Sequence, residues 1–157
     1  MIYKLSATSR TSTKWDNQEM KTLTIEWQRL VDQRGQTCDR CASTGDATEA
    51  AFAKLSRCLA EVGMEVLLEK KALDNSTFFA NPLRSNQIWI DGRTIEKWLG
   101  ASTGQSSCCG PCGDSECRTV SLDGQTYEAI PEDLILRAGL LAAAEKLRPN
   151  HPSQECC

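Results

Sequence analysis

Residues 23–41 read LTIEWQRLVDQRGQTCDRC, and this stretch decides the fold. Apolar and polar residues alternate from Leu23 toward Leu30, a pattern that predicts a half-buried β-strand. A loop that contains a glycine follows and leads to a C-x-x-C pair formed by Cys38 and Cys41. The sequence therefore predicts a strand that delivers two thiols to the next element of the fold.

The segment after the C-x-x-C pair predicts a helix and then a second strand. Apolar residues recur at helical spacing from Asp46 to Val62, and Gly63 is expected to end that helix. Met64–Leu68 predicts a strand. Residues 74–86 show no clear period and are predicted to form a loop.

Two Asp-Gly dipeptides predict β-hairpins, because they supply the positive φ angles that a type I′ turn requires. The hairpins join Gln87–Ile90 to Arg93–Ile95 and Thr119–Leu122 to Thr126–Glu128. A short helical turn is expected over Glu96–Leu99, and the Ser/Gly/Cys-rich residues 101–117 are predicted to be loop. Pro131 is a first-turn residue for a final helix that extends to about Leu147.

Length, charge and hydropathy restrict the function classes. The chain has 157 residues, enough for one domain with a hydrophobic core. A net charge of -3 with scattered basic residues argues against nucleic-acid binding. No apolar run approaches the roughly 20 residues of a membrane helix, so no membrane association is expected.

The ends of the chain and its cysteine count indicate a reducing compartment. Residues 1–20 lack an apolar signal sequence and are expected to be a disordered leader, with Met20 as an alternative start. Residues 148–157 are expected to be a flexible tail that carries Cys156 and Cys157. A cytoplasmic location is therefore expected, where nine cysteines favour metal or redox chemistry over a disulfide framework.

Several short motifs resemble known families. Ser85–Gly92 reads Ser-Asn-Gln-Ile-Trp-Ile-Asp-Gly and resembles the glutaredoxin stretch Val-Pro-Gln-Ile-Phe-Ile-Asp-Gly. The chain from Leu23 to about Leu147 is also similar to an uncharacterised prokaryotic family of thioredoxin-like domains. The shared motifs are Glu26-Trp27, Thr37–Cys41 and Cys117–Val120.

The resemblance implies a thioredoxin-like α/β fold, with a mixed sheet flanked by helices. It implies one domain over residues 21–147 with a Cys-rich insertion at 101–118. It supplies no activity, because that family has no settled one. Glutaredoxins and thioredoxins place a cis-proline beside the active site, where this chain has Asn86. That departure argues against general disulfide reductase activity and favours metal access to the C-x-x-C pair.

Cys38 and Cys41 are the candidate catalytic residues. In an oxidoreductase, Cys38 would attack a disulfide and Cys41 would resolve the mixed disulfide. The attacking thiol must ionise, so its pKa must fall below the ordinary value of about 8.5. Arg40 and Arg34 are candidates to assist. A helix that begins at Asp46 would add little, because the helix dipole acts only within its first turn.

A second cluster holds Cys108, Cys109, Cys112 and Cys117, which are the candidate metal ligands. Converging thiolates suit zinc or an iron–sulfur cluster. Cys108 and Cys109 are adjacent, which strains binding of both to one ion. A mixed site that combines the last three cysteines with Cys38 or Cys41 is the alternative. A loop closed by disulfides is a further alternative.

The remaining candidates carry weaker signals. Cys58 lies on the helical stripe and is expected to be buried. The vicinal pair Cys156-Cys157 resembles the C-terminal thiol pairs of mercuric reductases, although only two residues match. The single histidine, His151, lies in the tail, so a Cys-His dyad has no evident place.

The sequence favours cytoplasmic thiol–disulfide redox chemistry at Cys38 and Cys41, with the second cluster relaying or storing a disulfide. The expected partner is a thiol or disulfide protein or a low-molecular-weight thiol. The alternative is a non-enzymatic protein that binds zinc, mercury, arsenic or an iron–sulfur cluster through both cysteine clusters. A third interpretation makes the insertion a zinc-stapled interaction surface. The sequence leaves open whether the protein is an enzyme and whether it holds any cofactor.

Overall fold

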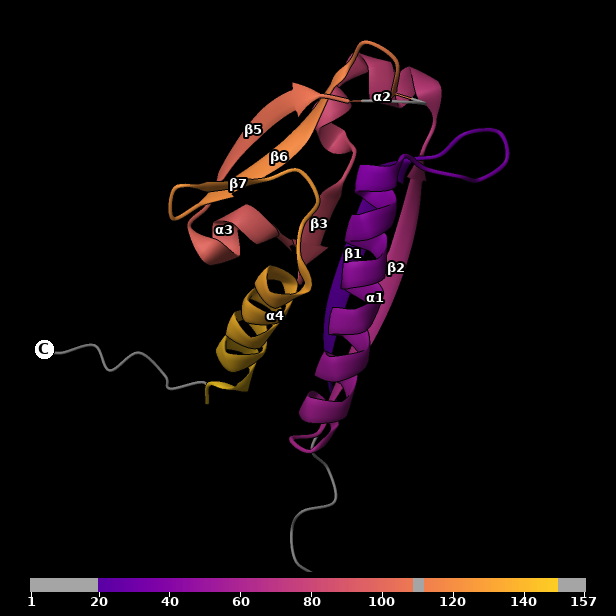
Figure 1. The fold of residues 1–157 in the computed structure, drawn as a ribbon. Helices are drawn as coiled ribbons and strands as arrows, with labels where there is room; N and C mark the ends of the chain where they lie inside the picture. The colour runs from indigo at the N-terminus through magenta and orange to yellow at the C-terminus, as the bar shows by residue number, and fades with distance from the viewer. Residues whose placement is uncertain (1–19, 109–111, 150–157) are drawn as a thin grey trace, which may run out of the picture.

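A four-stranded mixed sheet organises the chain, in the order β2-β1-β3-β4. The computed structural model describes residues 20–108 and 112–149, shown in Figure 1. The strands of this sheet are β1 (Lys21–Leu30), β2 (Met64–Leu73), β3 (Gln87–Ile90) and β4 (Arg93–Thr94). β1 pairs in parallel with β2 and antiparallel with β3, and β3 pairs antiparallel with β4.

The predicted alternation in β1 is confirmed. Leu23 and Ile25 are fully buried and Trp27 is 5% exposed, while the residues between them are partly exposed. β2 extends to Leu73, beyond the predicted end at Leu68. The sequence did not indicate this extension, because several later residues of the strand are charged and they show no apolar pattern.

Helix α1 (Asp39–Ala60) begins at the C-x-x-C pair, so the predicted start at Asp46 is wrong. Its first turns bury small side chains instead of large apolar ones, including Thr44, Gly45 and Thr48. Hydrophobic periodicity cannot reveal such a face. At the other end the helix stops before Val62, which is 50% exposed.

The small residues of α1 are required by a close approach to β1. A Cβ atom at Gly45 would lie 2.5 Å from the Cη2 atom of Trp27, closer than real Cβ contacts. The indole ring therefore occupies the space that a side chain at position 45 would fill, and it fixes the height of the helix above the sheet.

Helix α4 (Glu132–Leu147) packs against α1, and the predicted final helix is confirmed. A Cβ atom at Gly139 would lie 2.5 Å from Leu55 Cδ1, so this contact is also close. Both helices contact β1. The expected α/β class, with a mixed sheet and flanking helices, is confirmed.

Both predicted Asp-Gly hairpins are present. Asp91 and Gly92 have φ angles of 50° and 77°, and Asp123 and Gly124 have φ angles of 52° and 81°. The first turn joins β3 to β4, and α3 (Ile95–Leu99) follows it directly. The second turn joins β6 (Glu116–Leu122) to β7 (Gln125–Tyr127).

The Cys-rich insertion contains a strand that the sequence did not indicate. β5 (Ser102–Ser107) pairs antiparallel with β6, and β5, β6 and β7 form a second sheet. The loop prediction for residues 101–117 is therefore wrong for this part. The sequence of β5 is Ser-Thr-Gly-Gln-Ser-Ser, which has no apolar alternation because backbone pairing, not burial, defines the strand.

Residues 74–86 also differ from the loop prediction. They form α2 (Asn75–Ala80) and the 3-10 helix η1 (Pro82–Arg84). Asp74 caps α2 by accepting a hydrogen bond from the Thr77 N–H, and Phe78 is fully buried. The signals were an N-cap aspartate and a first-turn proline, which are too short-ranged to produce a period.

A buried ion pair connects the second sheet to the first. Arg118 on β6 donates from Nε to Glu96 Oε1 on α3 at 2.8 Å, and both side chains are less than 10% exposed. The same guanidinium donates to the Leu83 carbonyl at 2.9 Å and to Thr103 Oγ1 at 3.0 Å. The Arg118 side chain on β6 therefore contacts three other elements, α3, η1 and β5.

The Gly45–Trp27 contact gives a stability prediction. Gly45→Ala should lower the free energy of unfolding by roughly 1–3 kcal/mol, because the added methyl overlaps the indole ring. Urea unfolding at constant temperature measures the change. Ser43→Ala, at an exposed position on the same helix, is the matched control and should change stability by about 0.5 kcal/mol or less. Equal stability of Gly45→Ala and wild type would contradict the packing described.

Candidate functional site

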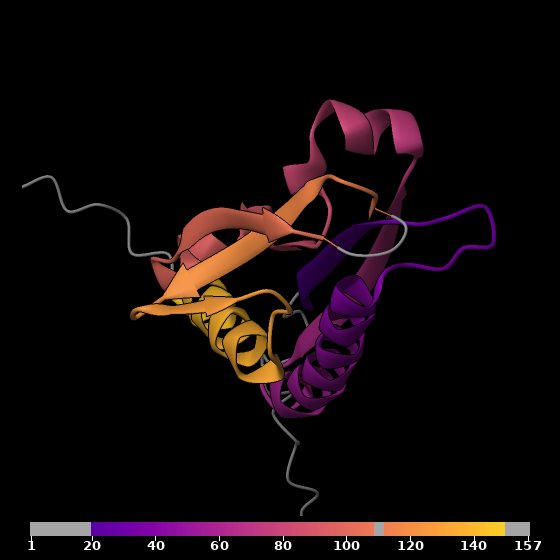
Figure 2. The same cartoon turned by 45° about the horizontal axis from the view of Figure 1, so that its top comes forward.

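The start of α1 and the insertion bring five cysteines together at one end of the first sheet. Figure 2 shows the second sheet beside the N-terminal end of α1. The five are Cys38 and Cys41 from the C-x-x-C pair and Cys108, Cys112 and Cys117 from the insertion. All five are present as thiols. Two cysteine groups that are separate in sequence therefore form one site.

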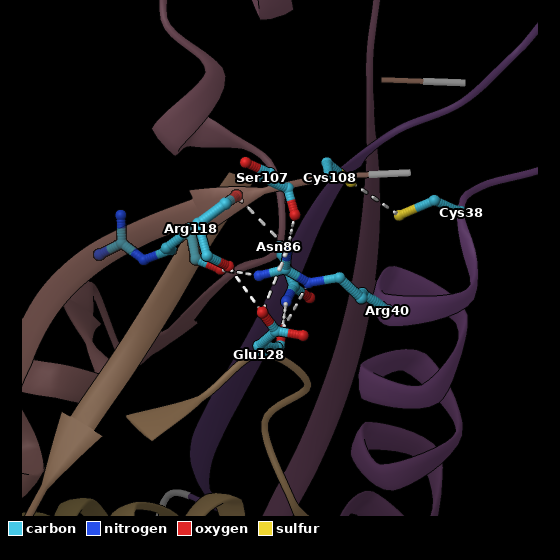
Figure 3. A network of polar contacts seen from close by, with 8 residues as sticks. Cys38, Arg40, Asn86, Ser107, Cys108, Arg118 and Glu128 are labelled. Atoms are coloured by element: carbon cyan, nitrogen blue, oxygen red, sulfur yellow. Dashed lines mark hydrogen bonds and ion pairs between the residues drawn. The ribbon is translucent and has the colours of Figure 1, made fainter. Parts of the chain in front are cut away.

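The distances define an inner triangle of sulfurs. The Cys108 thiol donates to Cys38 Sγ at 3.9 Å (Figure 3). The sulfurs of Cys38, Cys108 and Cys112 all lie within 4.8 Å of one another. Cys38 is 5% exposed and Cys112 is 1% exposed, whereas Cys108 is partly exposed. We refer to these three residues as the thiol triangle.

The two thiols of the C-x-x-C pair have opposite acidities. The pKa of Cys38 is lowered to about 5, chiefly because the Cys41 thiol donates a hydrogen bond to its sulfur. Burial opposes this effect, while the Cys41 backbone N–H and the thiols of Cys108 and Cys112 add to it. The pKa of Cys41 is raised, first by that hydrogen bond to Cys38, then by burial and by the nearby negative charge.

Two thiols of the insertion, Cys112 and Cys117, are held in their neutral form. Burial is the main reason that the pKa of Cys112 is raised, and hydrogen bonds with Cys108 and Cys117 contribute. Burial also raises the pKa of Cys117 to about 12. Among the thiols with shifted acidity, Cys38 is therefore the one that carries negative charge at neutral pH.

The position of Cys38 in α1 agrees with its acidity. Cys38 is the N-cap residue of α1, so it lies beside the backbone N–H groups of the first helical turn, which have no partner within the helix. The sequence analysis expected little contribution from a helix that begins at Asp46, and that condition is not met because α1 begins at Asp39. Helix N-termini stabilise thiolates.

Ser85 contacts the second thiol of the pair and was not identified from the sequence. Its Oγ lies 3.6 Å from Cys41 Sγ, and both residues are buried. The Leu30 backbone N–H donates to the same Oγ at 3.0 Å. Because the Cys41 thiol donates its own proton to Cys38, the Ser85 hydroxyl is the donor in this contact. No sequence motif predicts this contact, because Ser85 and Cys41 lie on different elements and are far apart in the chain.

Arg40, one of the two residues between Cys38 and Cys41, joins α1 to the insertion. Its guanidinium donates to the carbonyls of Ser107 at 3.1 Å and Arg118 at 3.3 Å, and lies 3.9 Å from Glu128 Oε1 (Figure 3). The sequence suggested Arg40 and Arg34 as activating cations for Cys38. The main causes of the lowered pKa of Cys38 are instead the neighbouring thiols and the Cys41 backbone N–H. Arg40 instead fixes the backbone beside Cys108, and Arg34 is exposed in the preceding turn.

Asn86 occupies the place of the glutaredoxin proline in a different backbone conformation. Its φ angle is 57°, which a proline ring cannot adopt and which asparagine tolerates. The side chain is 2% exposed, and its Nδ2 donates to the Glu128 carbonyl at 3.1 Å. Asn86 therefore anchors the chain segment after β7 that also contacts Arg40.

Several candidates from the sequence lie elsewhere. Cys58 is exposed on α1, so the expectation that it is buried is wrong. Its neighbours Leu55 and Leu59 form the buried stripe, and Cys58 points away from it. Cys109, His151 and Cys156-Cys157 lie outside the described residues. No helix within residues 20–108 and 112–149 is long and apolar enough to cross a membrane.

Comparisons with known proteins agree with an uncharacterised family and supply no activity. The family model described as "Domain of unknown function (DUF2703)" matches residues 23–139. An uncharacterized protein of Archaeoglobus fulgidus is 42% identical over 114 residues, which cover 72% of this chain and 82% of that protein. No solved structure matches the chain significantly. The chain belongs to the DUF2703 family.

Proposed function

We propose that the protein is a thioredoxin-like thiol–disulfide exchange protein that uses Cys38 as nucleophile and Cys41 as resolving thiol. The observation that carries the proposal is the opposed acidity of these two neighbours, one with a pKa of about 5 and one with a raised pKa. Exchange requires a thiolate that attacks and a thiol that is kept protonated until the second step.

The topology supports the thioredoxin-like assignment. The chain runs through a strand, a C-x-x-C pair at a helix start, a parallel strand, a hairpin and a helix, which is the order the resemblance implies. The antiparallel β3 lies directly beside β1, so the hairpin reaches the sheet edge opposite to β2. Asn86 remains a departure from thioredoxins and glutaredoxins, and it suggests a narrower range of substrates.

The proposed reaction has two displacement steps. The Cys38 thiolate attacks one sulfur of a substrate disulfide, forms a mixed disulfide and releases the other sulfur as a thiolate. Cys41 then loses its proton and attacks Cys38 Sγ, which releases the second substrate sulfur. The pair is oxidised to a Cys38–Cys41 disulfide and the substrate receives two electrons.

Ser85 assists the second step in this mechanism. A hydroxyl that donates to Cys41 Sγ lowers the pKa of that thiol, against the larger effects that raise it. The hydrogen bond stabilises the thiolate that must form when Cys41 attacks. Ser85 is therefore a positioning residue for resolution.

The insertion provides an outer thiol for the pair. Cys38 is only 5% exposed, and Cys108, 3.9 Å away, is the more exposed of the two. Attack of Cys108 on a Cys38–Cys41 disulfide would pass the bond outward, and Cys112 could then resolve it. The proposed partner is a disulfide or thiol protein, or a low-molecular-weight thiol, in the reducing cytoplasm.

The lowered pKa of Cys38 predicts a pH profile. Alkylation of Cys38 by iodoacetamide should rise through a midpoint near pH 5, because the thiolate is the reacting form. The rate should then be flat near pH 7, whereas a cysteine in an unstructured peptide titrates near 8.5. Mass spectrometry of the Cys38 peptide measures the rate. Cys41→Ala should move the midpoint upward, and a wild-type midpoint near 8.5 would contradict the proposal.

Trapping with oxidised glutathione tests the order of attack. Wild type should form a Cys38–Cys41 disulfide, and Cys41→Ser should form Cys38–Cys108 because Cys108 is the next sulfur. The triple variant Cys41→Ser/Cys108→Ser/Cys112→Ser should accumulate glutathione on Cys38, detected by intact mass, because Cys112 also lies within 4.8 Å of Cys38. Cys58→Ser is the control and should behave as wild type. A Cys38→Ser variant that still reduces glutathione disulfide at the wild-type rate would exclude the mechanism.

The Ser85 contact predicts a selective defect. Ser85→Ala should lengthen the lifetime of a Cys38 mixed disulfide by roughly tenfold, equivalent to about 1.4 kcal/mol, the scale of one lost hydrogen bond. The alkylation midpoint of Cys38 should not move with it. Stopped-flow release of a chromogenic thiol measures the lifetime, with Ser43→Ala as control. Equal lifetimes in both variants would remove Ser85 from the mechanism.

Soft-metal binding is the second candidate function. The observation that favours it is the thiol triangle, whose sulfurs lie within 4.8 Å of one another. Zinc, mercury and iron–sulfur clusters all take thiolate ligands. Exchange and binding use the same Cys38, so each state of the site excludes the other.

A further inference from the structure

We infer that the thiol triangle is a capture site for a trivalent thiophilic ion of the arsenite and antimonite class. The inference rests on the soft-metal candidate proposed above, whose ligand it names, and it does not depend on thiol–disulfide exchange. It specifies the ligand from the number and placement of the sulfurs.

The sulfurs come from both parts of the site and are held by the fold. Cys38 lies at the start of α1, Cys108 directly follows β5, and Cys112 precedes β6. Their mutual distances of 4.8 Å or less mean that one small ion can contact all three after a modest contraction. The Cys108 end remains partly exposed, so an ion has a route of entry.

The number of sulfurs selects the ion. Trivalent arsenic and antimony keep a lone pair and form three single bonds in a pyramid, so a triangle of thiolates on one side completes their coordination. Zinc in structural sites takes four ligands in a tetrahedron. Among the described residues, the one group of acidic, histidine and cysteine side chains that meets this mutual distance has three members. Cys41 and Cys117 lie nearby but outside it.

The hydrogen bonds of Arg40 hold the segments that carry the thiol triangle in place before an ion binds. Arg40 follows Cys38 closely in the chain and donates to the carbonyl of Ser107, the neighbour of Cys108. A rigid connection between two ligand segments reduces the entropy lost on binding. The ion therefore meets ligands already placed by contacts that do not involve it.

The capture reaction balances without an electron donor. Arsenous acid carries three hydroxyl groups on trivalent arsenic. Each protonated thiol, or a thiolate with one proton from solvent, replaces one hydroxyl. Three As–S bonds form, three As–O bonds break, and three water molecules leave. Arsenic stays trivalent and no sulfur is oxidised. The bound ion occupies Cys38 and blocks its attack on disulfides.

The test is arsenite titration of the fully reduced full-length chain under anaerobic conditions. We expect one arsenic per chain and three As–S bonds by X-ray absorption. Alkylation followed by peptide mass spectrometry should show protection of Cys38, Cys108 and Cys112, and this measurement requires no variant. Protection of Cys38 and Cys41 alone, with two As–S bonds, would overturn the inference in favour of a simple dithiol chelate.

Variants give an independent check. Serine at any member of the triangle should weaken arsenite binding by more than the roughly 10–100-fold that loss of an outer-shell partner costs. Cys41→Ser and Cys117→Ser should retain three-sulfur binding, as should the exposed control Cys58→Ser. Circular dichroism verifies that each variant is folded.

Different measurements test the exchange proposal and the arsenite inference, so either can be contradicted without the other. Cys41→Ser should lose formation of the Cys38–Cys41 disulfide yet retain arsenite. An equal loss of arsenite on Cys109→Ser, or a four-sulfur zinc complex that arsenite does not displace, would overturn the three-thiol assignment. Neither outcome bears on the alkylation profile of Cys38.

Discussion

The buried ion pair between Arg118 and Glu96 is the interaction on which the thiol site depends. It attaches the second sheet to α3, and so to the hairpin of the first sheet, with both side chains less than 10% exposed. Burying two charges is costly, and additional hydrogen bonds from the guanidinium to Leu83 and Thr103 offset part of that cost. Removing either partner would leave a buried charge and would release the strand that carries Cys117.

Arg40 makes the second connection, from α1 to the backbone of the same sheet, and one of its acceptors is the carbonyl of Arg118 itself. It reaches from α1 to the backbone of β5 and β6, so the distance from Cys38 to Cys108 is set by a side chain that is not itself reactive. Arg118 therefore attaches the second sheet to α3, and Arg40 attaches the same sheet to the start of α1.

The sequence predicted the first sheet well, because β1 alternates in polarity and the Asp-Gly turns have one favoured geometry. It misplaced the start of α1 because Thr44, Gly45 and Thr48 are small, and their burial against Trp27 depends on a partner distant in sequence. It missed β5 because that strand is polar and is defined by its pairing with β6. Cys38 and Cys41 could be identified from their spacing, but the approach of Cys108 and Cys112 required the fold.

In the proposed scheme, Cys38 belongs both to the C-x-x-C pair and to the thiol triangle, so binding of an ion would change the reduction potential of the pair. An ion that binds only the reduced site stabilises that state by RT ln(1 + [L]/Kd), which is about 2.7 kcal/mol at one hundred times Kd. For a two-electron couple this raises the reduction potential by about 60 mV. The bound protein would then resist oxidation that the ion-free protein undergoes, and an oxidising environment would release the ion. Thermodynamic linkage of this kind makes a single sulfur atom report on two chemical conditions of its surroundings.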